Sequence, residues 1–289
     1  MPQTACQDLS SGFEHLVLIA FGKNSEEAVM AFLVGYTACF DDSGTHPGSP
    51  TAVCAGYVAT VTQWRHLEKE WREADAREPF MPFHTADCLS RHKQFEGWDN
   101  QRVYGLLRKL TGIINSRVRY AVISAVVKKD YDEVVPEWLK ERAGRKPYTF
   151  CVASCLGFIK QWRDQYKITS PIEYIFDWMG KGKGEIMGAF GGLIRYHHQD
   201  DIGAYKGGLS FQTKDRFVQL QAADIIATAG GHHMNYKVLA GKSTEGEPLF
   251  DEVMKFKPRP SNRYFDRKNL IEWVARMEKH KDDPNWGIV

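Results

Sequence analysis

Two strongly apolar runs stand close together in the first quarter of the chain, Ala31–Phe40 and Thr51–Val61. Runs of this length that are rich in apolar, β-branched and aromatic residues are typical of buried strands. The segment Ser43–Pro50 between them is rich in the turn-forming residues Gly, Pro and Ser. Because so short a connection joins neighbouring antiparallel strands, the pattern predicts a sheet that begins with a β-hairpin.

The remaining elements are predicted from the same kinds of pattern. Further strands are predicted at Val118–Val127, Ile172–Phe176 and Gly207–Gln212. Helices are predicted at Trp64–Ala76, Gln101–Asn115, Thr149–Tyr166, Gly184–His197, Phe217–Leu239 and Leu270–His280. A hairpin followed by alternating strands and helices predicts a mixed α/β sheet, antiparallel at first and then parallel, flanked by helices. A helical insertion at about residues 62–116 separates the second strand from the third.

Three regions are expected along the chain. Residues 1–29 fit poorly with the strand and helix pattern of the rest of the chain and are predicted to be an N-terminal extension, with Met30 as a second candidate start. Residues 30–245 contain the predicted sheet and form the main domain. Residues 246–289 are a basic C-terminal segment with a short helix, which we expect to pack on the same domain.

Composition narrows the class of protein. The 289 residues are 43% hydrophobic and 26% charged, which allows a sizeable core. A net charge of +2 means that any nucleic-acid binding has to come from local patches. The six cysteines form no C-x-x-C pair, which predicts reduced thiols and a cytoplasmic location. No apolar run approaches the roughly 18 residues that span a bilayer, so no membrane association is predicted.

Three aspartates stand where an unpaired charge is costly. Asp41 follows the first predicted strand, Asp177 follows the fourth, and Asp224 interrupts an apolar helix. If the two strands are parallel neighbours and the helix packs across their ends, the three carboxylates meet. Their repulsion then favours a bound cation, and Mg²⁺ or Mn²⁺ prefers such oxygen ligands. Two such ions can activate water and stabilise the leaving oxygen in phosphodiester cleavage.

Other interpretations of these aspartates are open. A carboxylate just after a strand is often a turn or helix-cap residue, although Asp224 lies inside its helix, where no cap is needed. The segment Asp42–Thr45 also matches the Asp-Ser-Gly-Thr loop of an aspartic protease. That class needs two such loops sharing one proton, and the chain has one copy.

The motifs around the aspartates resemble a known family. "FDDSGT" after a strand, "IFDWMG" after a later strand and "LQAADIIA" in a late helix look like the family called domain of unknown function 3800. That family is placed with ribonuclease H-like proteins, whose element order the chain shares. The resemblance covers residue 31 to about residue 240 and implies that Asp41, Asp177 and Asp224 match the acids of the family, with Gln221 beside the last. It implies metal-dependent nucleic-acid hydrolysis, with ties to phage defence or mobile elements.

One departure from the pattern concerns a fourth ligand. Ribonuclease H enzymes take a Glu from the helix after the third strand, whereas the helix Thr149–Tyr166 has only Asp164 as an acid. The candidates for the missing ligand are Asp42, Glu185, and Asp87 together with His84. His84 is also a candidate for acid–base catalysis.

Two basic segments are candidates for binding nucleic acid. The Gly-rich loop after Asp177 carries Lys181 and Lys183, which are candidates for holding a substrate phosphate, with a plain solvated loop as the alternative. In the segment Lys255–Lys268, basic residues alternate with Phe256, Tyr264 and Phe265. Basic side chains neutralise phosphates and aromatic faces stack on unpaired bases. The predicted contacts in this segment are Lys255, Lys257, Arg259, Arg263 and Tyr264.

The function expected from the sequence is that of a Mg²⁺- or Mn²⁺-dependent nuclease of ribonuclease H-like fold. Asp41, Asp177 and Asp224 are its predicted metal ligands and Asp42 a predicted helper. The alternative is a non-catalytic protein of the same fold that binds nucleic acid or serves as a partner in a defence system. The missing helical Glu favours this alternative.

Overall fold

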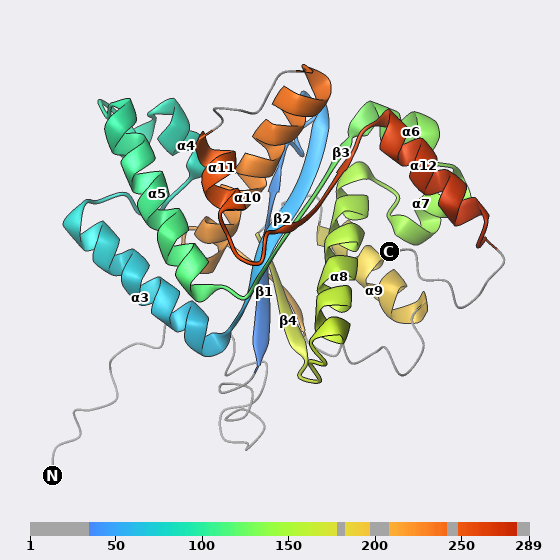
Figure 1. Cartoon of the computed structure of the whole chain (residues 1–289), viewed down its shortest axis with the longest axis horizontal. Helices are drawn as coiled ribbons and strands as arrows, with labels where there is room; N and C mark the ends of the chain where they lie inside the picture. Colours follow the sequence, from blue (N-terminus) through green and yellow to red (C-terminus); the bar gives the residue numbers. More distant parts are fainter. Residues whose placement is uncertain (1–34, 178–182, 197–207, 242–247, 282–289) are drawn as a thin grey trace, which may run out of the picture.

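A mixed six-stranded sheet runs through the part of the chain described by the computed structural model, which covers residues 35–177, 183–196, 208–241 and 248–281 (Figure 1). The strand order is β5-β4-β1-β2-β3-β6. The strands are β1 (Tyr36–Ser43), β2 (Thr51–Thr60), β3 (Tyr120–Val127), β4 (Ile172–Asp177), β5 (Leu209–Gln212) and β6 (Ser261–Phe265).

The strand directions place five carboxyl ends at one edge of the sheet. β2 is antiparallel to both β1 and β3, so β1 and β3 run in the same direction. β4 pairs in parallel with β1, β5 with β4, and β6 with β3. The predicted hairpin and the predicted change from antiparallel to parallel pairing are therefore confirmed.

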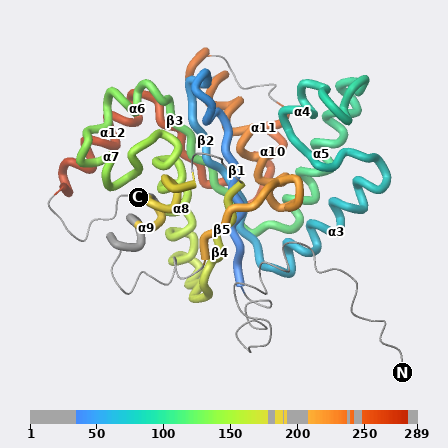
Figure 2. Tube along the Cα trace, turned by 180° about the vertical axis from the view of Figure 1, so that it is seen from behind, coloured from blue at the N-terminus to red at the C-terminus, as the bar shows by residue number. Residues whose placement is uncertain are grey.

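Helices cover both faces of the sheet (Figures 1 and 2). One face carries α3 (Val61–Arg77), α4 (Thr85–Ser90), α5 (Asn100–Arg117), α10 (Val218–His233) and α11 (Pro248–Met254). The other carries α6 (Lys128–Val134), α7 (Glu137–Ala143), α8 (Pro147–Gln165), α9 (Lys183–Tyr196) and α12 (Arg267–Glu278). Two short helical turns complete the described structure, Lys93–Phe95 and Met234–Leu239, the second of which continues α10.

Each face has its own core because successive strand residues point to opposite sides of a sheet. Cys39 and Val53 belong to the core under α3, α5 and α10. Phe40 and Cys54, the next residues along the same strands, belong to the core under α8. The near-continuous apolar sequence of the central strands thus reflects burial on both faces. The described cysteines Cys39, Cys54, Cys88, Cys151 and Cys155 are buried free thiols.

Some predicted boundaries were wrong. The first strand continues through Asp41 and Asp42 to Ser43, so these two aspartates belong to the strand rather than to the turn after it. The strand β6 was missed because it lies in the basic segment Lys255–Lys268, where charged residues conceal the alternation. The short helices α4, α6, α7 and α11 were missed as well, since six or seven residues carry little periodic signal. Residues 1–29 and Lys181 lie outside the described residues.

The described helices are each too short or too polar to span a lipid bilayer.

Helix α10 approaches the sheet closely. Two glycines of the helix face the strands: Gly230 packs against Ile123 and Val53, and Gly231 against Ser43. A Cβ atom at Gly230 would lie 2.8 Å from Cγ2 of Ile123, which is closer than two carbon atoms can pack. This close packing sets the depth at which the helix, and with it Asp224, lies on the sheet.

We expect Gly230→Ala to lower the free energy of unfolding by about 1–3 kcal/mol through overpacking, offset in part by the better helix propensity of Ala. The matched control is Gly112→Ala in α5, where a Cβ atom meets nothing within 4 Å. This control should raise the free energy of unfolding by up to about 1 kcal/mol. Urea unfolding of both variants measures the difference, and equal effects would show that the close approach is not needed.

Candidate functional site

Asp41 and Asp177 lie side by side on neighbouring strands. β1 and β4 pair in parallel with Phe40 opposite Phe176, so the next residue on each strand is an aspartate. Since Cys39 and Ile175 face α10, the aspartates two residues further along face the same way. Asp41 is only 1% exposed.

Helix α10 supplies the third carboxylate. Asp224 is buried in the first half of the helix, on the side that packs against β1 and β2. Its Oδ2 atom accepts a hydrogen bond of 2.6 Å from the backbone N–H of Thr85, the first residue of α4. The three aspartates predicted to converge therefore do so, each from a different element of the fold.

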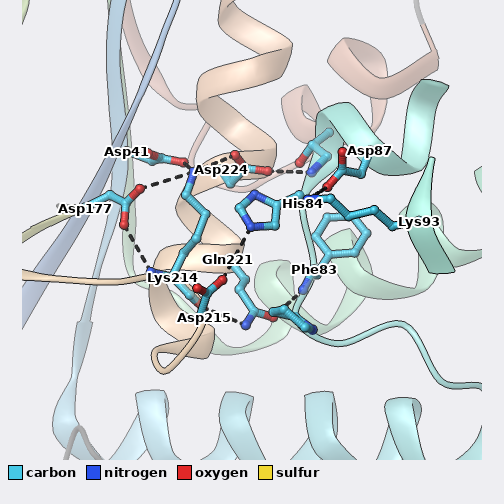
Figure 3. A network of polar contacts seen from close by, with 12 residues as sticks. Asp41, Phe83, His84, Asp87, Lys93, Asp177, Lys214, Asp215, Gln221 and Asp224 are labelled. Atoms are coloured by element: carbon cyan, nitrogen blue, oxygen red, sulfur yellow. Dashed lines mark hydrogen bonds and ion pairs between the residues drawn. The ribbon is translucent and has the colours of Figure 1, made fainter. Parts of the chain in front are cut away.

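The centre of the cluster holds the ammonium group of Lys214 (Figure 3). Its Nζ atom lies 2.6 Å from Oδ2 of Asp41, 3.0 Å from Oδ1 of Asp224 and 3.3 Å from Oδ2 of Asp177. All three oxygens lie within 3.3 Å of one nitrogen atom. Any two of them are therefore separated by no more than about twice that distance. We call Asp41, Asp177 and Asp224 the aspartate triad.

The backbone of Lys214 is held in place on both sides. Its N–H donates to Oδ1 of Asp177 at 3.0 Å, and its carbonyl oxygen accepts from Nε2 of Gln221 at 2.8 Å. Gln221 in turn accepts from Nε1 of Trp71 and from the backbone N–H of Phe83. Gln221, predicted as an accessory residue of the site, thus positions the turn that carries Lys214 and ties it to α3 and to the segment before α4.

Sequence reasoning missed Lys214. The residue lies in a turn between β5 and α10, with no motif around it. One signal was available, because Lys214 comes two residues after the end of a strand predicted to run parallel to the one that ends in Asp177. Parallel neighbours end at the same edge of a sheet, which places a residue after β5 near a residue at the end of β4.

The charges in the site do not balance, because three carboxylates face one ammonium group. Burial raises the pKa of Asp41 well above its usual range, and the neighbouring aspartates add to this effect. Burial also opposes ionisation of Asp224, but the ammonium of Lys214 and the hydrogen bonds from Asp41 and Thr85 prevail and lower the pKa of Asp224. Burial disfavours the charged form of Lys214 too, yet the three carboxylates raise its pKa above the usual lysine range. The site is therefore built to hold positive charge.

The candidates for a fourth ligand do not join the triad. Asp42 points to the opposite face of β1 from Asp41, where its Oδ2 atom accepts from the hydroxyl of Thr45 and where burial raises its pKa. Glu185 in α9 pairs with Lys146. Asp87 pairs with Lys93, whose Nζ atom is 2.8 Å away. The alternation of strand residues explains why Asp42, although adjacent in sequence, points away.

His84 lies at the edge of the same network. Its Nε2 atom is 3.6 Å from Oδ1 of Asp215, the residue next to Lys214, and its ring is partly exposed (Figure 3). His84 also precedes Thr85, whose N–H holds Asp224. Of the two predicted phosphate-binding lysines, Lys183 is described, and its ammonium lies 5.1 Å from the centre of the Phe211 ring.

The prediction is wrong for two of the three aromatic residues of the predicted nucleic-acid surface. Phe256 and Phe265 are buried core residues. Tyr264 packs against His233, with 4.6 Å between ring centres, and its hydroxyl is buried without a partner among the described residues. Phe256 and Phe265 are therefore not available for stacking on bases, whereas Tyr264 is only partly buried and lines the pocket described below. The basic side chains of the same segment, in contrast, reach solvent. Lys257 and Arg259 are exposed. Lys255 is also exposed and pairs with Glu252.

A polar pocket of about 360 Å³ lies between β6 and α12. It is lined by Asn262, Arg263, Tyr264, Phe265, Asn269, Glu272, Trp273 and Arg276. The guanidinium of Arg263 lies 5.1 Å from the centre of the Phe158 ring, and burial together with Arg276 lowers its pKa. Neither Arg263 nor Arg276 forms an ion pair with a carboxylate of the described part of the chain. Glu272 also lines the pocket but pairs with Lys268, so neither arginine has an ion-pair partner among the described residues.

No protein-family model and no curated protein matches the sequence. Within the described ranges, no group of three or more His, Cys, Asp and Glu side chains is arranged to hold a metal ion as it stands. The aspartate triad instead surrounds the ammonium of Lys214.

We expect Lys214→Met to lower the free energy of unfolding by about 3–5 kcal/mol at neutral pH, because it leaves buried carboxylates without a counter-charge. Lys214 lowers the pKa of Asp224, so this stabilisation is present above the ordinary aspartate pKa and is lost as the pH falls through the folded-state value. The loss caused by the substitution should therefore shrink in acid.

Denaturant unfolding in a metal-free buffer at several pH values measures this effect. The control is Lys129→Met, which removes an exposed lysine 3.8 Å from Glu133 and should change stability by less than about 1 kcal/mol. A Lys214 variant as stable as the control would contradict a buried, charged cluster.

Proposed function

We propose that the protein is a divalent-metal-dependent nuclease of ribonuclease H-like fold, with Asp41, Asp177 and Asp224 as its metal ligands. The observation that carries the proposal is the convergence of these three carboxylates on a single cation at the carboxyl edge of β1 and β4. Buried carboxylates that serve only as turn or cap residues have no reason to meet at one point.

The chemistry of the site fits Mg²⁺ or Mn²⁺. Its donors are carboxylate oxygens, the ligands that these hard cations prefer, and their side chains are largely buried. The triad already holds one positive charge, and burial together with the neighbouring aspartates still raises the pKa of Asp41, so a further positive charge would favour its ionised form. A pair of such ions supplies an activated water and a clamp for the leaving oxygen of a phosphodiester.

The surrounding residues have supporting roles in the proposal. Thr85 donates its N–H to Asp224 and keeps that carboxylate ionised and oriented. His84, partly exposed beside Asp215, is the proposed group for proton transfer at the rim. The element order supports the ribonuclease H-like assignment, because an antiparallel β1-β2-β3 unit followed by parallel β4 and β5 with helices on both faces is the arrangement expected of that fold.

The proposed substrate is nucleic acid. The support is the cluster of basic side chains around β6, in which Lys257 and Arg259 are exposed and Arg263 and Arg276 lack a carboxylate partner among the described residues. Arginines that are not neutralised by acids attract phosphates.

A second candidate function is that of a non-catalytic protein that binds nucleic acid. The observation that favours it is the composition of α8, whose acid Asp164 is half exposed and pairs with Lys160. No described carboxylate from that helix reaches the triad. In this alternative, Lys214 is the permanent cation of a structural cluster.

A nuclease assay tests the first proposal. Purified protein with Mg²⁺ or Mn²⁺ should cleave single-stranded DNA, RNA or a hybrid. Asp177→Asn and Asp224→Asn should each lower the rate by at least the roughly 10–100-fold that loss of an outer-shell partner costs a metal site. Asp164→Asn is the matched control and should retain activity. Equal cleavage by wild type and the triad variants would assign the activity to a contaminant or another site.

Binding to labelled oligonucleotides tests the proposed nucleic-acid contacts. Arg263→Ala with Arg276→Ala should weaken binding and lower the slope of log K against log salt by about 0.7 for each lost contact with a single strand. Arg145→Ala removes an exposed arginine that is already paired with Glu137 and Glu141, and should leave the slope unchanged. An unchanged slope in the double variant would exclude this pocket from the interface.

A further inference from the structure

Lys214 fills the position that a metal ion would need. Its ammonium group has three N–H bonds and faces three carboxylate oxygens at 2.6, 3.0 and 3.3 Å. Each aspartate of the triad therefore directs an oxygen at the same point. Two cations cannot share that point, since like charges at such distances repel strongly in a largely buried site.

The anchoring of Lys214 allows its side chain to leave without moving the turn. The backbone N–H is held by Asp177 and the carbonyl by Gln221, so the position of the residue does not depend on the ammonium. The aliphatic stem has four carbons with rotatable bonds. The side chain is 16% exposed, so it already borders solvent.

We propose that Lys214 is a built-in competitor for the metal site. In the metal-free protein its ammonium partly compensates the charge of the triad and keeps the ligands together, and it leaves the triad when a divalent ion binds. This inference rests on the proposed function, since it assumes that the triad holds a metal. The consequence is a protein that folds stably without metal and binds metal more weakly than its three carboxylates alone would allow.

The extent to which Lys214 weakens metal binding depends on how often its ammonium lies outside the triad. The apparent affinity for metal is reduced by the fraction of molecules in which Lys214 is outside the triad. A minor state populated at about 0.1–10% weakens metal binding between about tenfold and a thousandfold. Removing the ammonium should strengthen metal binding by the same factor.

Metal titration by calorimetry, with Mg²⁺ and Mn²⁺ separately, tests the inference. Lys214→Met should bind metal at least about tenfold more tightly than wild type. The matched control is Lys93→Met, which removes a positive charge from the same region, at Asp87, without touching the triad (Figure 3). It should change the affinity far less. If both variants raise the affinity for metal equally, the effect comes from the loss of any nearby positive charge, and the inference fails.

A second measurement needs only the wild-type protein, in case Lys214→Met does not fold. Acylation of lysines, followed by mass spectrometry, should find Lys214 protected without metal and several-fold more reactive at saturating Mg²⁺. The exposed Lys268 should react equally in both states.

The outcomes separate the inference from the proposed function. Metal binding that Asp177→Asn and Asp224→Asn abolish, with Lys214 equally protected in both states, would overturn the inference and leave the proposed function standing. Absence of metal binding in wild type and in Lys214→Met would overturn both.

Discussion

The burial of three carboxylates around one ammonium is the interaction on which the rest of the site depends. Asp41, Asp177 and Asp224 come from a hairpin strand, a parallel strand and a helix, and none has another cation within reach among the described residues. Without a positive charge at that point, burial and mutual repulsion would drive the carboxyl groups apart or protonate them. The raised pKa of Asp41 shows that one ammonium compensates this strain only in part.

The fold brings these charges together through packing that involves no charge. Parallel pairing of β1 with β4 puts two aspartates in one row, and the close approach of α10 at Gly230 brings the third within reach. Gln221 then links α10, the Lys214 turn and the segment before α4 with hydrogen bonds. The same helix thus supplies a carboxylate and positions its counter-ion, so the geometry of the site is inseparable from the packing of α10.

Local patterns predicted more of the scaffold than of the surface. The central strands and long helices were recognised because their apolar periodicity extends over many residues. The triad was predicted because each aspartate interrupts apolar sequence at the end of a strand or inside a helix. The base-stacking role predicted for Phe256 and Phe265 is wrong for a related reason, since interleaved basic and aromatic residues describe a segment with buried rings as well as they describe a binding surface.

The sequence by itself determined the mixed sheet, its helical cover and the three acids that meet at its edge. Their positions follow from strand periodicity and from the cost of burying charge, which are local properties. Only the tertiary structure decided which way Asp42 points and which cation the triad holds. Asp42 is adjacent to Asp41, but the alternation of β1 sends it to the other face. Lys214 lies 173 residues from Asp41 along the chain, and their contact exists because β5 ends beside β4 and α10 folds back across them.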